Sequence, residues 1–110
     1  MTVNELIKKE IMERGGCIYF MTNKNRTTIY LGVTSNLLNR VNEHRTHKYQ
    51  GSFSDKYNLE CLIFYEFRPS IEEAIAREKQ VKKWNRSKKE ALINSQNPEW
   101  KDLWEEIIKW

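Results

Sequence analysis

Two short apolar runs joined by a polar turn constrain the fold of this chain more than any other feature. Residues 17–22 and 28–33 are rich in β-branched, aromatic and aliphatic side chains, and residues 23–26 between them are polar. Runs of this length and composition are typical of β-strands, and a polar turn between two of them predicts a hairpin. The chain is therefore expected to build a sheet around this hairpin.

The length of the hairpin turn sets which residues face each other. A tight two-residue turn at 24–25 would place Tyr19 opposite Tyr30, and Cys17 opposite Gly32. Because side chains alternate along a strand, both phenols would then point to one face. Two hydroxyls beside the bare backbone of a glycine would let a substrate approach closely. The alternative is a half-buried hairpin whose aromatic residues only fill the core.

A helix is predicted directly after the hairpin. Residues 34–36 read Thr-Ser-Asn, a good N-terminal cap, and apolar residues recur at helical spacing over 37–41. Arg40 and His44 are four residues apart, so they share one side of this helix. We therefore expect one cleft to collect four polar side chains, namely Tyr19, Tyr30, Arg40 and His44.

This ordered set resembles the GIY-YIG nuclease family, which is named after its two strand tripeptides. Here the tripeptides read Cys-Ile-Tyr and Tyr-Leu-Gly, and the likeness continues through Glu78 and covers about residues 17–97. It is greatest to the small stand-alone branch, whose members are similar over 74–84 and 97–100 as well. Cys17 departs from the family's glycine, and Val33 stands where excision-repair members carry lysine.

The remaining pattern predicts an α+β fold in one domain, residues 1–110, with the motif-bearing core at about 17–97. The nearly continuous apolar run 61–65 is typical of a central strand covered on both faces. Three strands that do not alternate with helices indicate a small three-stranded antiparallel sheet flanked by helices, the architecture that the resemblance also implies. Phe53 and Tyr57 are expected to anchor a polar, turn-rich segment at 46–58. Further helices are expected at 4–14, from a capping box at 70–73 onward, at 88–94 and at about 98–109.

Glu78 breaks the pattern of the helix that follows the capping box. It falls in the middle of an apolar face defined by Ile71, Ala74, Ile75 and Val81. A carboxylate on a buried face is unfavourable unless something compensates its charge. The compensation could be an ion pair, for example with Arg40, an outward turn of the side chain, or a hard divalent cation.

The resemblance implies a role for each matching residue. Glu78 matches the family's metal ligand, which would hold one Mg²⁺ or Mn²⁺ ion. Tyr30 matches the general base, and Tyr19 matches the tyrosine that positions the attacking water and the phosphate. Arg40 matches the arginine on the scissile phosphate, and His44 assists at the same site. A late asparagine also belongs to the family pattern, and the candidates are Asn97, Asn85 and Asn94.

The charge pattern is compatible with a nucleic-acid partner. The chain has 19 basic and 15 acidic residues, a net charge of +4, which tolerates polyanions. A basic segment around Glu78 would contact phosphates without reading sequence, or it is an ordinary solvated helix face. Trp84 within it could stack on a base or belong to the core. The segment comprises Arg77, Lys79, Lys82, Lys83, Arg86, Lys88 and Lys89.

The interpretation favoured by these observations is a cytoplasmic, metal-dependent endonuclease that hydrolyses DNA. Its alternatives are a nucleic-acid-binding domain that retains the nuclease fold with little or no activity, and a protein-interaction module that uses the C-terminal Trp/Ile helix. No apolar run is long enough for a signal peptide or a membrane span. Two cysteines and two histidines without metal-ligand spacing argue against zinc. We expect both cysteines to be reduced core thiols, although a disulfide is also compatible with the sequence.

Overall fold

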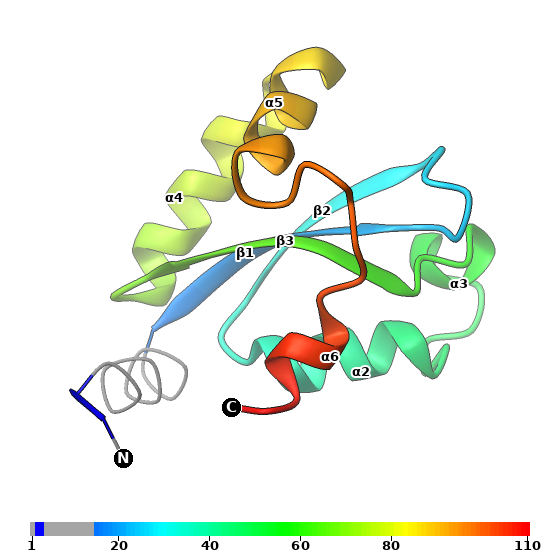
Figure 1. Ribbon diagram of the computed structural model, residues 1–110, viewed down its shortest axis with the longest axis horizontal. Helices are drawn as coiled ribbons and strands as arrows, with labels where there is room; N and C mark the ends of the chain where they lie inside the picture. Colours follow the sequence, from blue (N-terminus) through cyan, green and yellow to red (C-terminus); the bar gives the residue numbers. More distant parts are fainter. Residues whose placement is uncertain (1, 4–14) are drawn as a thin grey trace.

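An antiparallel sheet of three strands, in the order β2-β1-β3, forms the centre of the computed structural model (Figure 1). The structure describes residues 2, 3 and 15–110, so the helix expected at 4–14 lies outside the described residues. The strands are β1 (Gly16–Thr22), β2 (Ile29–Thr34) and β3 (Cys61–Arg68). With helices packed around this sheet, the α+β class predicted from the sequence is confirmed.

The hairpin is present, but its predicted register is wrong. Tyr19 pairs with Gly32, and Tyr30 pairs with Met21. The tight turn does not form because the Asn23 side chain organises a longer loop over residues 23–28. Its Oδ1 accepts hydrogen bonds from the backbone N–H groups of Thr27 (2.9 Å) and Thr28 (3.0 Å), the local bonding that asparagine offers to turns.

The third apolar run forms an edge strand, so the prediction of a central strand is wrong. β1 is the central strand and is buried along its whole length. The run is apolar because Leu62 packs into the core on one face of the sheet and Ile63 into the core on the other. Side chains satisfy its outer backbone edge: Gln96 Nε2 donates to the carbonyl of Tyr65 (2.9 Å) and Gln96 Oε1 accepts from its N–H (3.1 Å). A covered edge of this kind resists pairing with another chain.

Capping side chains begin the three longer helices, and two of them start where the sequence predicts a cap. Asn36 accepts a hydrogen bond from the N–H of Asn39 at the start of α2 (Leu37–Arg45). At the start of α4 (Ile71–Lys82), Ser70 Oγ accepts from the N–H of Glu73 (3.2 Å), as in the predicted capping box, but it also donates to the Glu73 carboxylate (3.1 Å). Asn85 caps α5 (Arg86–Gln96), which includes the helix expected at 88–94.

The C-terminal helix is much shorter than the predicted 98–109. Only α6 (Trp104–Ile107) is helical. Asn97 ends α5 instead of starting a helix, and Trp100 adopts a positive φ of 52°, which no α-helix accommodates. The apolar residues of this segment therefore reach the core from an irregular chain.

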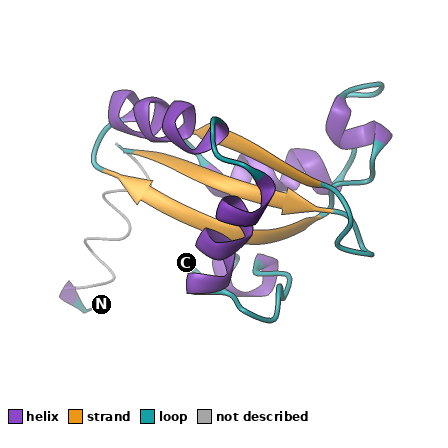
Figure 2. Cartoon of the chain, turned by 90° about the horizontal axis from the view of Figure 1, so that it is seen from above, coloured by secondary structure: helices purple, strands orange, loops and turns teal. Residues whose placement is uncertain are grey.

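The helices form one layer on each face of the sheet (Figures 1 and 2). On one face, Tyr19 and its neighbours pack with residues of α2 and α6. On the opposite face, Ile18 and Phe20 pack with Val81 of α4 and Ile93 of α5. Strand alternation separates the two cores, because neighbouring residues of β1 point to opposite sides. No helix within the described residues is long and apolar enough to cross a membrane.

The segment 46–58 contains the short helix α3 (Phe53–Lys56) and is not anchored as predicted. The side chains of Phe53 and Tyr57 are 48% and 46% exposed. Ser54 and the adjoining Leu59 are buried in their place. Both cysteines are free thiols, so the structure contains no disulfide between them.

Candidate active site

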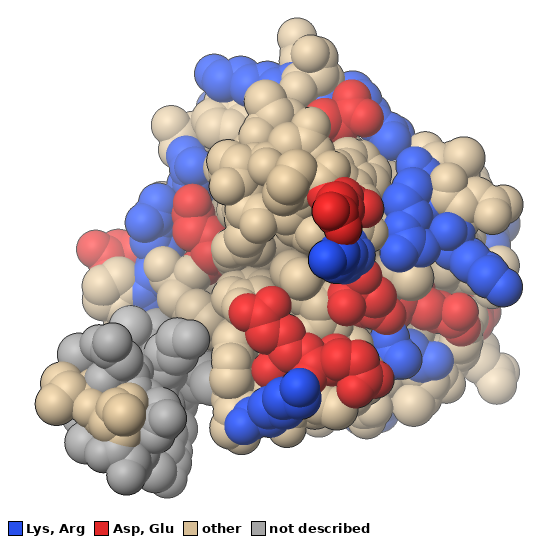
Figure 3. Space-filling model, in the orientation of Figure 1, with Lys and Arg blue, Asp and Glu red and all other residues tan. Residues whose placement is uncertain are grey.

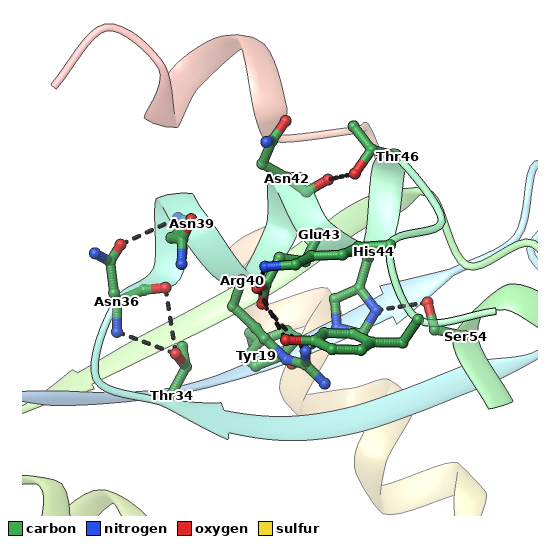
Figure 4. A network of polar contacts seen from close by, with 12 residues as sticks. Tyr19, Thr34, Asn36, Asn39, Arg40, Asn42, Glu43, His44, Thr46 and Ser54 are labelled. Atoms are coloured by element: carbon green, nitrogen blue, oxygen red, sulfur yellow. Dashed lines mark hydrogen bonds and ion pairs between the residues drawn. The ribbon is translucent and has the colours of Figure 1, made fainter. Parts of the chain in front are cut away.

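Four side chains predicted to share a cleft converge on one face of the sheet (Figure 4 shows Tyr19, Arg40 and His44). The Tyr19 hydroxyl lies 2.9 Å from Nε2 of His44. The ring centroids of Tyr19 and Tyr30 are 6.4 Å apart, and those of Tyr30 and His44 are 5.7 Å apart. A cavity between β2, α2 and the 46–58 segment is lined by Tyr30, Arg40 and His44, among others.

Gly32 makes this arrangement possible through its missing side chain. A Cβ atom at Gly32 would lie 2.7 Å from Cε1 of the Tyr19 ring and closer still to its hydroxyl oxygen. The ring of Tyr19 therefore crosses directly over the glycine backbone. The expectation that this bare backbone receives a substrate is wrong, because Tyr19 already fills the space.

A chain of hydrogen bonds holds the buried end of the site. Ser54 Oγ lies 2.5 Å from Nδ1 of His44, and the Tyr19 hydroxyl lies at Nε2. Burial and the positive charge of Arg40 lower the pKa of His44 to about 4, so the imidazole is neutral near pH 7. Burial, followed by the neighbouring Tyr30, raises the pKa of Tyr19 well above its ordinary value. Tyr19 therefore keeps its proton and can donate it to a neutral His44.

Arg40 lies at the border of the cavity, beside the Tyr19 hydroxyl, and connects it to further polar residues. Its Nη1 donates to Oε1 of Glu43 (3.2 Å), and its guanidinium lies 5.4 Å from the centroid of the Tyr49 ring. Glu43 also accepts from Lys48 Nζ (3.1 Å) and the Tyr49 hydroxyl (3.2 Å). The hydrogen bond from Lys48 is the main reason why the pKa of Glu43 is lowered.

Sequence reasoning missed Glu43, Ser54 and Tyr49. Glu43 follows Arg40 by three residues on one helix, a spacing at which opposite charges meet, so this pair could have been found. Ser54 is ten residues from His44 along the chain and reaches it only because the loop folds back. No local pattern would have identified it.

Glu78 occupies a different part of the molecule from the four clustered residues. It lies on α4, which packs against the opposite face of the sheet from Tyr19. The predicted apolar face of α4 is only partly buried, because Ala74 and Val81 are buried but Ile75 is 38% exposed. Glu78 is half-buried, and its spacing of four residues from Ala74 and three from Val81 places it on their side of the helix. Arg40 pairs with Glu43 and not with Glu78. Within residues 15–110, no hydrogen bond or ion pair engages the Glu78 carboxylate.

The basic segment also belongs to the layer of α4 and α5, and Figure 3 shows Lys and Arg side chains gathered over these helices. Some of its members have structural partners. Arg77 Nε donates to Glu66 Oε2 (2.9 Å), and Arg86 donates to the carbonyl of Thr27 (3.0 Å). The half-buried Trp84 ring packs on the core, and two cations lie over it, Arg77 at 5.2 Å and Lys88 at 4.3 Å from its centroid. The side chains of Lys79, Lys82 and Lys83 are exposed.

The GIY-YIG catalytic domain matches residues 15–91, most of the chain. The chain belongs to the GIY-YIG family. A UPF0213 protein from Syntrophus aciditrophicus (strain SB) is 36% identical over 72 residues, which cover 66% of this chain and 82% of that protein. The solution NMR structure of a UPF0213 protein from Bacillus halodurans is similar at 26% identity, with a TM-score of 0.50 over 80% of this chain and 92% of that chain.

GIY-YIG nucleases generally use divalent cations, so a residue that can bind one is expected in this chain. No group of three His, Cys, Asp or Glu residues in the described part of the chain could hold a metal ion. A GIY-YIG site does not need such a group if the cation is Mg²⁺, which binds through one or two carboxylates and keeps several waters. A single carboxylate without a competing cationic partner, as at Glu78, fits that requirement.

The three candidate asparagines of the GIY-YIG pattern all make structural hydrogen bonds. Asn97 is buried, and its Nδ2 donates to the carbonyls of Ile63 (3.0 Å) and Lys101 (2.8 Å). Asn85 caps α5, and Asn94 accepts from the indole N–H of Trp100 (2.6 Å). None of these contacts reaches the Tyr19–His44 cluster. Asn85 lies inside the matched region, whereas Asn94 and Asn97 follow it.

Proposed function

We propose that this protein is an endonuclease that hydrolyses phosphodiester bonds in DNA, with Tyr30 as general base and one divalent cation. The observation that carries the proposal is the meeting of Tyr30, Arg40 and His44 at one cavity, in a chain that belongs to a family of nucleases. A general base, a fixed positive charge and a supporting hydrogen-bond chain are the groups that phosphodiester hydrolysis needs.

Each group has a position suited to its proposed role. Tyr30 lines the cavity, and in its phenolate form its oxygen would take the proton of the attacking water. Arg40 would contact the non-bridging oxygens of the phosphate, where the negative charge develops. Because Glu43 holds Arg40 in the free protein, the phosphate would exchange with this carboxylate as it binds.

His44, in the wall of the cavity, and Tyr19, behind it, would support the reaction. Tyr19 is 1% exposed and His44 is 4% exposed, so a bulky substrate would not reach them directly. Both nitrogens of His44 already have partners. His44 is thus better suited to holding the Tyr19 hydroxyl in place than to accepting the proton of the water. Tyr19 would in turn orient Arg40 and the ring of Tyr30.

The Glu78 carboxylate would hold the cation, either Mg²⁺ or Mn²⁺. When bound, such an ion supplies Lewis-acid chemistry. Because α4 packs on the face of the sheet opposite Tyr19, the ion would reach the leaving 3′ oxygen only if the nucleic acid extends from the cavity around the sheet to α4. The exposed lysines of α4, which follow Glu78 in the sequence, would guide the nucleic-acid backbone toward that layer. Acidic side chains gather over α6 (Figure 3), a surface that would repel phosphates.

A second candidate function is nucleic-acid binding without turnover. The Arg40–Glu43 ion pair favours it, because a phosphate must compete with a carboxylate that is already in place. Glu78 favours it as well, since it lies across the sheet from Tyr19 and its neighbours.

A titration of Mg²⁺ or Mn²⁺ against labelled DNA substrates separates the two functions. The panel would contain single-stranded, duplex and branched DNA and one RNA of matched length, with EDTA as the control. Cleavage that requires the metal supports the endonuclease. Tight binding without cleavage at any metal concentration supports the binding domain and contradicts the proposed enzyme.

A further inference from the structure

Exposed aromatic side chains gather beside the cavity. Tyr49, Phe53 and Tyr57 are 49%, 48% and 46% exposed, and all three belong to the segment that forms one wall. The ring centroids of Phe53 and Tyr57 are 4.6 Å apart, and that of Phe53 is 6.0 Å from that of Tyr30. The rings of Tyr57, Phe53 and Tyr30 therefore form a row that leads into the cavity. We call this row the aromatic platform.

The packing of the segment does not account for the exposure of these rings. Other contacts hold the segment in place: Ser54 bonds to His44 inside, and Leu59 is fully buried. At the surface, His47 bonds to Oδ1 of Asp55 (2.8 Å) and to Oε2 of Glu60 (2.5 Å). Contiguous exposed apolar surface on a soluble protein is commonly a binding site. A ligand that covers the platform would explain its exposure.

The charges around the platform indicate the chemistry of that ligand. Arg40 reaches over the Tyr49 ring, and Lys48 is 58% exposed at its side. Lys56 is exposed on α3, between Phe53 and Tyr57 in the sequence. Flat apolar rings flanked by cations are what single-stranded nucleic acid binds, with bases on the rings and phosphates on the cations.

We propose that the aromatic platform stacks an unpaired nucleobase next to the phosphate at Arg40. The substrate would then be a nucleic acid with an unpaired nucleotide at the cleavage position. The statement about the cleavage position rests on the proposed function. The stacking of a base on the platform does not, because it can be measured without cleavage. A base inside a duplex has both faces covered by its neighbours, so it offers no free face to the rings. Every base has such a face, and the platform would therefore show little sequence preference.

The test measures binding in EDTA, so that no cleavage occurs. Fluorescence anisotropy would compare an oligo-dT, an oligo-U and a blunt duplex of the same length, for the parent and for Phe53→Ala, Phe53→Leu and Phe53→Trp. Ile108→Ala serves as the matched control, because Ile108 is similarly exposed (44%) and belongs to the C-terminal segment. Circular dichroism would show that each variant is folded, as expected for substitutions at exposed positions.

We expect Phe53→Ala and Phe53→Leu to weaken single-strand binding by about 5- to 150-fold, the range for the removal of one base–ring stack. Phe53→Trp should retain affinity, and duplex binding and the Ile108→Ala control should be unchanged. The oligo-dT and oligo-U arms distinguish DNA from RNA. An equal loss on single strand and duplex, or no loss with Phe53→Leu, would overturn the platform.

A second measurement separates this inference from the proposed function. The fluorescence of 2-aminopurine falls when the base stacks on an aromatic ring, so the parent should quench it and Phe53→Leu should not. Quenching together with absent cleavage in Mg²⁺ would refute the enzyme and retain the platform. Cleavage without quenching would retain the enzyme and refute the platform.

Discussion

Tyr19 and Gly32 face each other across β1 and β2, and the tyrosine ring occupies the space that a side chain at Gly32 would take. This close approach sets the height of the Tyr19 hydroxyl and so its 2.9 Å contact with His44. Gly32, in the second family tripeptide, thus leaves the space that the ring of Tyr19, in the first tripeptide, needs.

Gly32→Ala should displace Tyr19 and lower both stability and activity. The new methyl group would overlap the Tyr19 ring and hydroxyl, and β1 is buried on both faces, so the ring cannot move freely. Overpacking of this kind costs about 1–3 kcal/mol. Urea denaturation would measure it, with Gly51→Ala as a contrasting control: nothing lies within 4 Å of a Cβ there, and its φ of +78° gives only backbone strain. A fully stable Gly32→Ala protein with parental activity would contradict the role given to the glycine.

Tyr30→Phe should abolish most catalysis and leave binding intact. The ring and its packing against His44 and Phe53 remain, but the proposed proton acceptor is removed. We expect kcat to fall by on the order of 10²–10⁴-fold, the usual contribution of a general base, with little change in affinity. Tyr19→Phe is the matched variant and should reduce kcat less. It should also lower the free energy of unfolding by about 1–3 kcal/mol, because the buried His44 loses its hydroxyl partner. Near-parental cleavage by Tyr30→Phe would assign the base to another group.

Glu78→Ala should prevent cleavage without preventing nucleic-acid binding. The carboxylate is the proposed cation ligand, and calorimetry should show weaker Mn²⁺ binding than in the parent. Glu78 is partly exposed and unpaired within the described residues, so the free energy of unfolding should change by less than about 0.5 kcal/mol. Glu72→Ala, an exposed change on the same helix, is the control. Unchanged Mn²⁺ affinity in Glu78→Ala would contradict the proposal that Glu78 binds the cation.

Stability should fall as the pH decreases from 6.5 toward 4, because His44 is buried in its neutral form. Its folded-state pKa of about 4 lies below the unfolded value of 6.5, so the unfolded chain binds more protons across this window. The expected slope approaches roughly 1.4 kcal/mol per pH unit.

His47 changes stability with pH in the direction opposite to His44, so the two contributions must be measured separately. Its bonds with Glu60 and Asp55 raise its pKa, so the stability it adds is present at low pH and is lost as the pH rises. Urea denaturation between pH 5 and 7 should therefore use His47→Gln as the reference and His44→Gln in that background. If the slope survives the removal of His44, the assignment fails.

Reversing Lys82 and Lys83 to glutamate should weaken binding about equally for unrelated sequences. Both side chains are exposed on the α4 side of the molecule, where they can contact phosphates without reading bases. The log–log dependence of affinity on salt should flatten by roughly one unit for each phosphate that the lysines no longer neutralise. Lys109→Glu, an exposed change at the far end of the chain, is the control. An unchanged salt slope would make this segment an ordinary solvated surface.

The sequence predicted the features that depend on neighbouring residues. The strands, the Asn36 cap and the Ser70 capping box follow from local bonding and lie where the pattern places them. The face shared by Tyr19 and Tyr30 was also predicted correctly, although the register was wrong. The true register differs by two residues, and a shift of two returns every side chain to the same face.

The sequence by itself therefore determined the fold class and the convergence of Tyr19, Tyr30, Arg40 and His44. Only the tertiary structure decided that Ser54 holds His44, that Glu43 holds Arg40, and that Glu78 lies on the other side of the sheet. These relations depend on how a loop folds back and on which face each helix packs against. Such choices are made by contacts between distant residues, whose spacing along the chain carries no periodic signal.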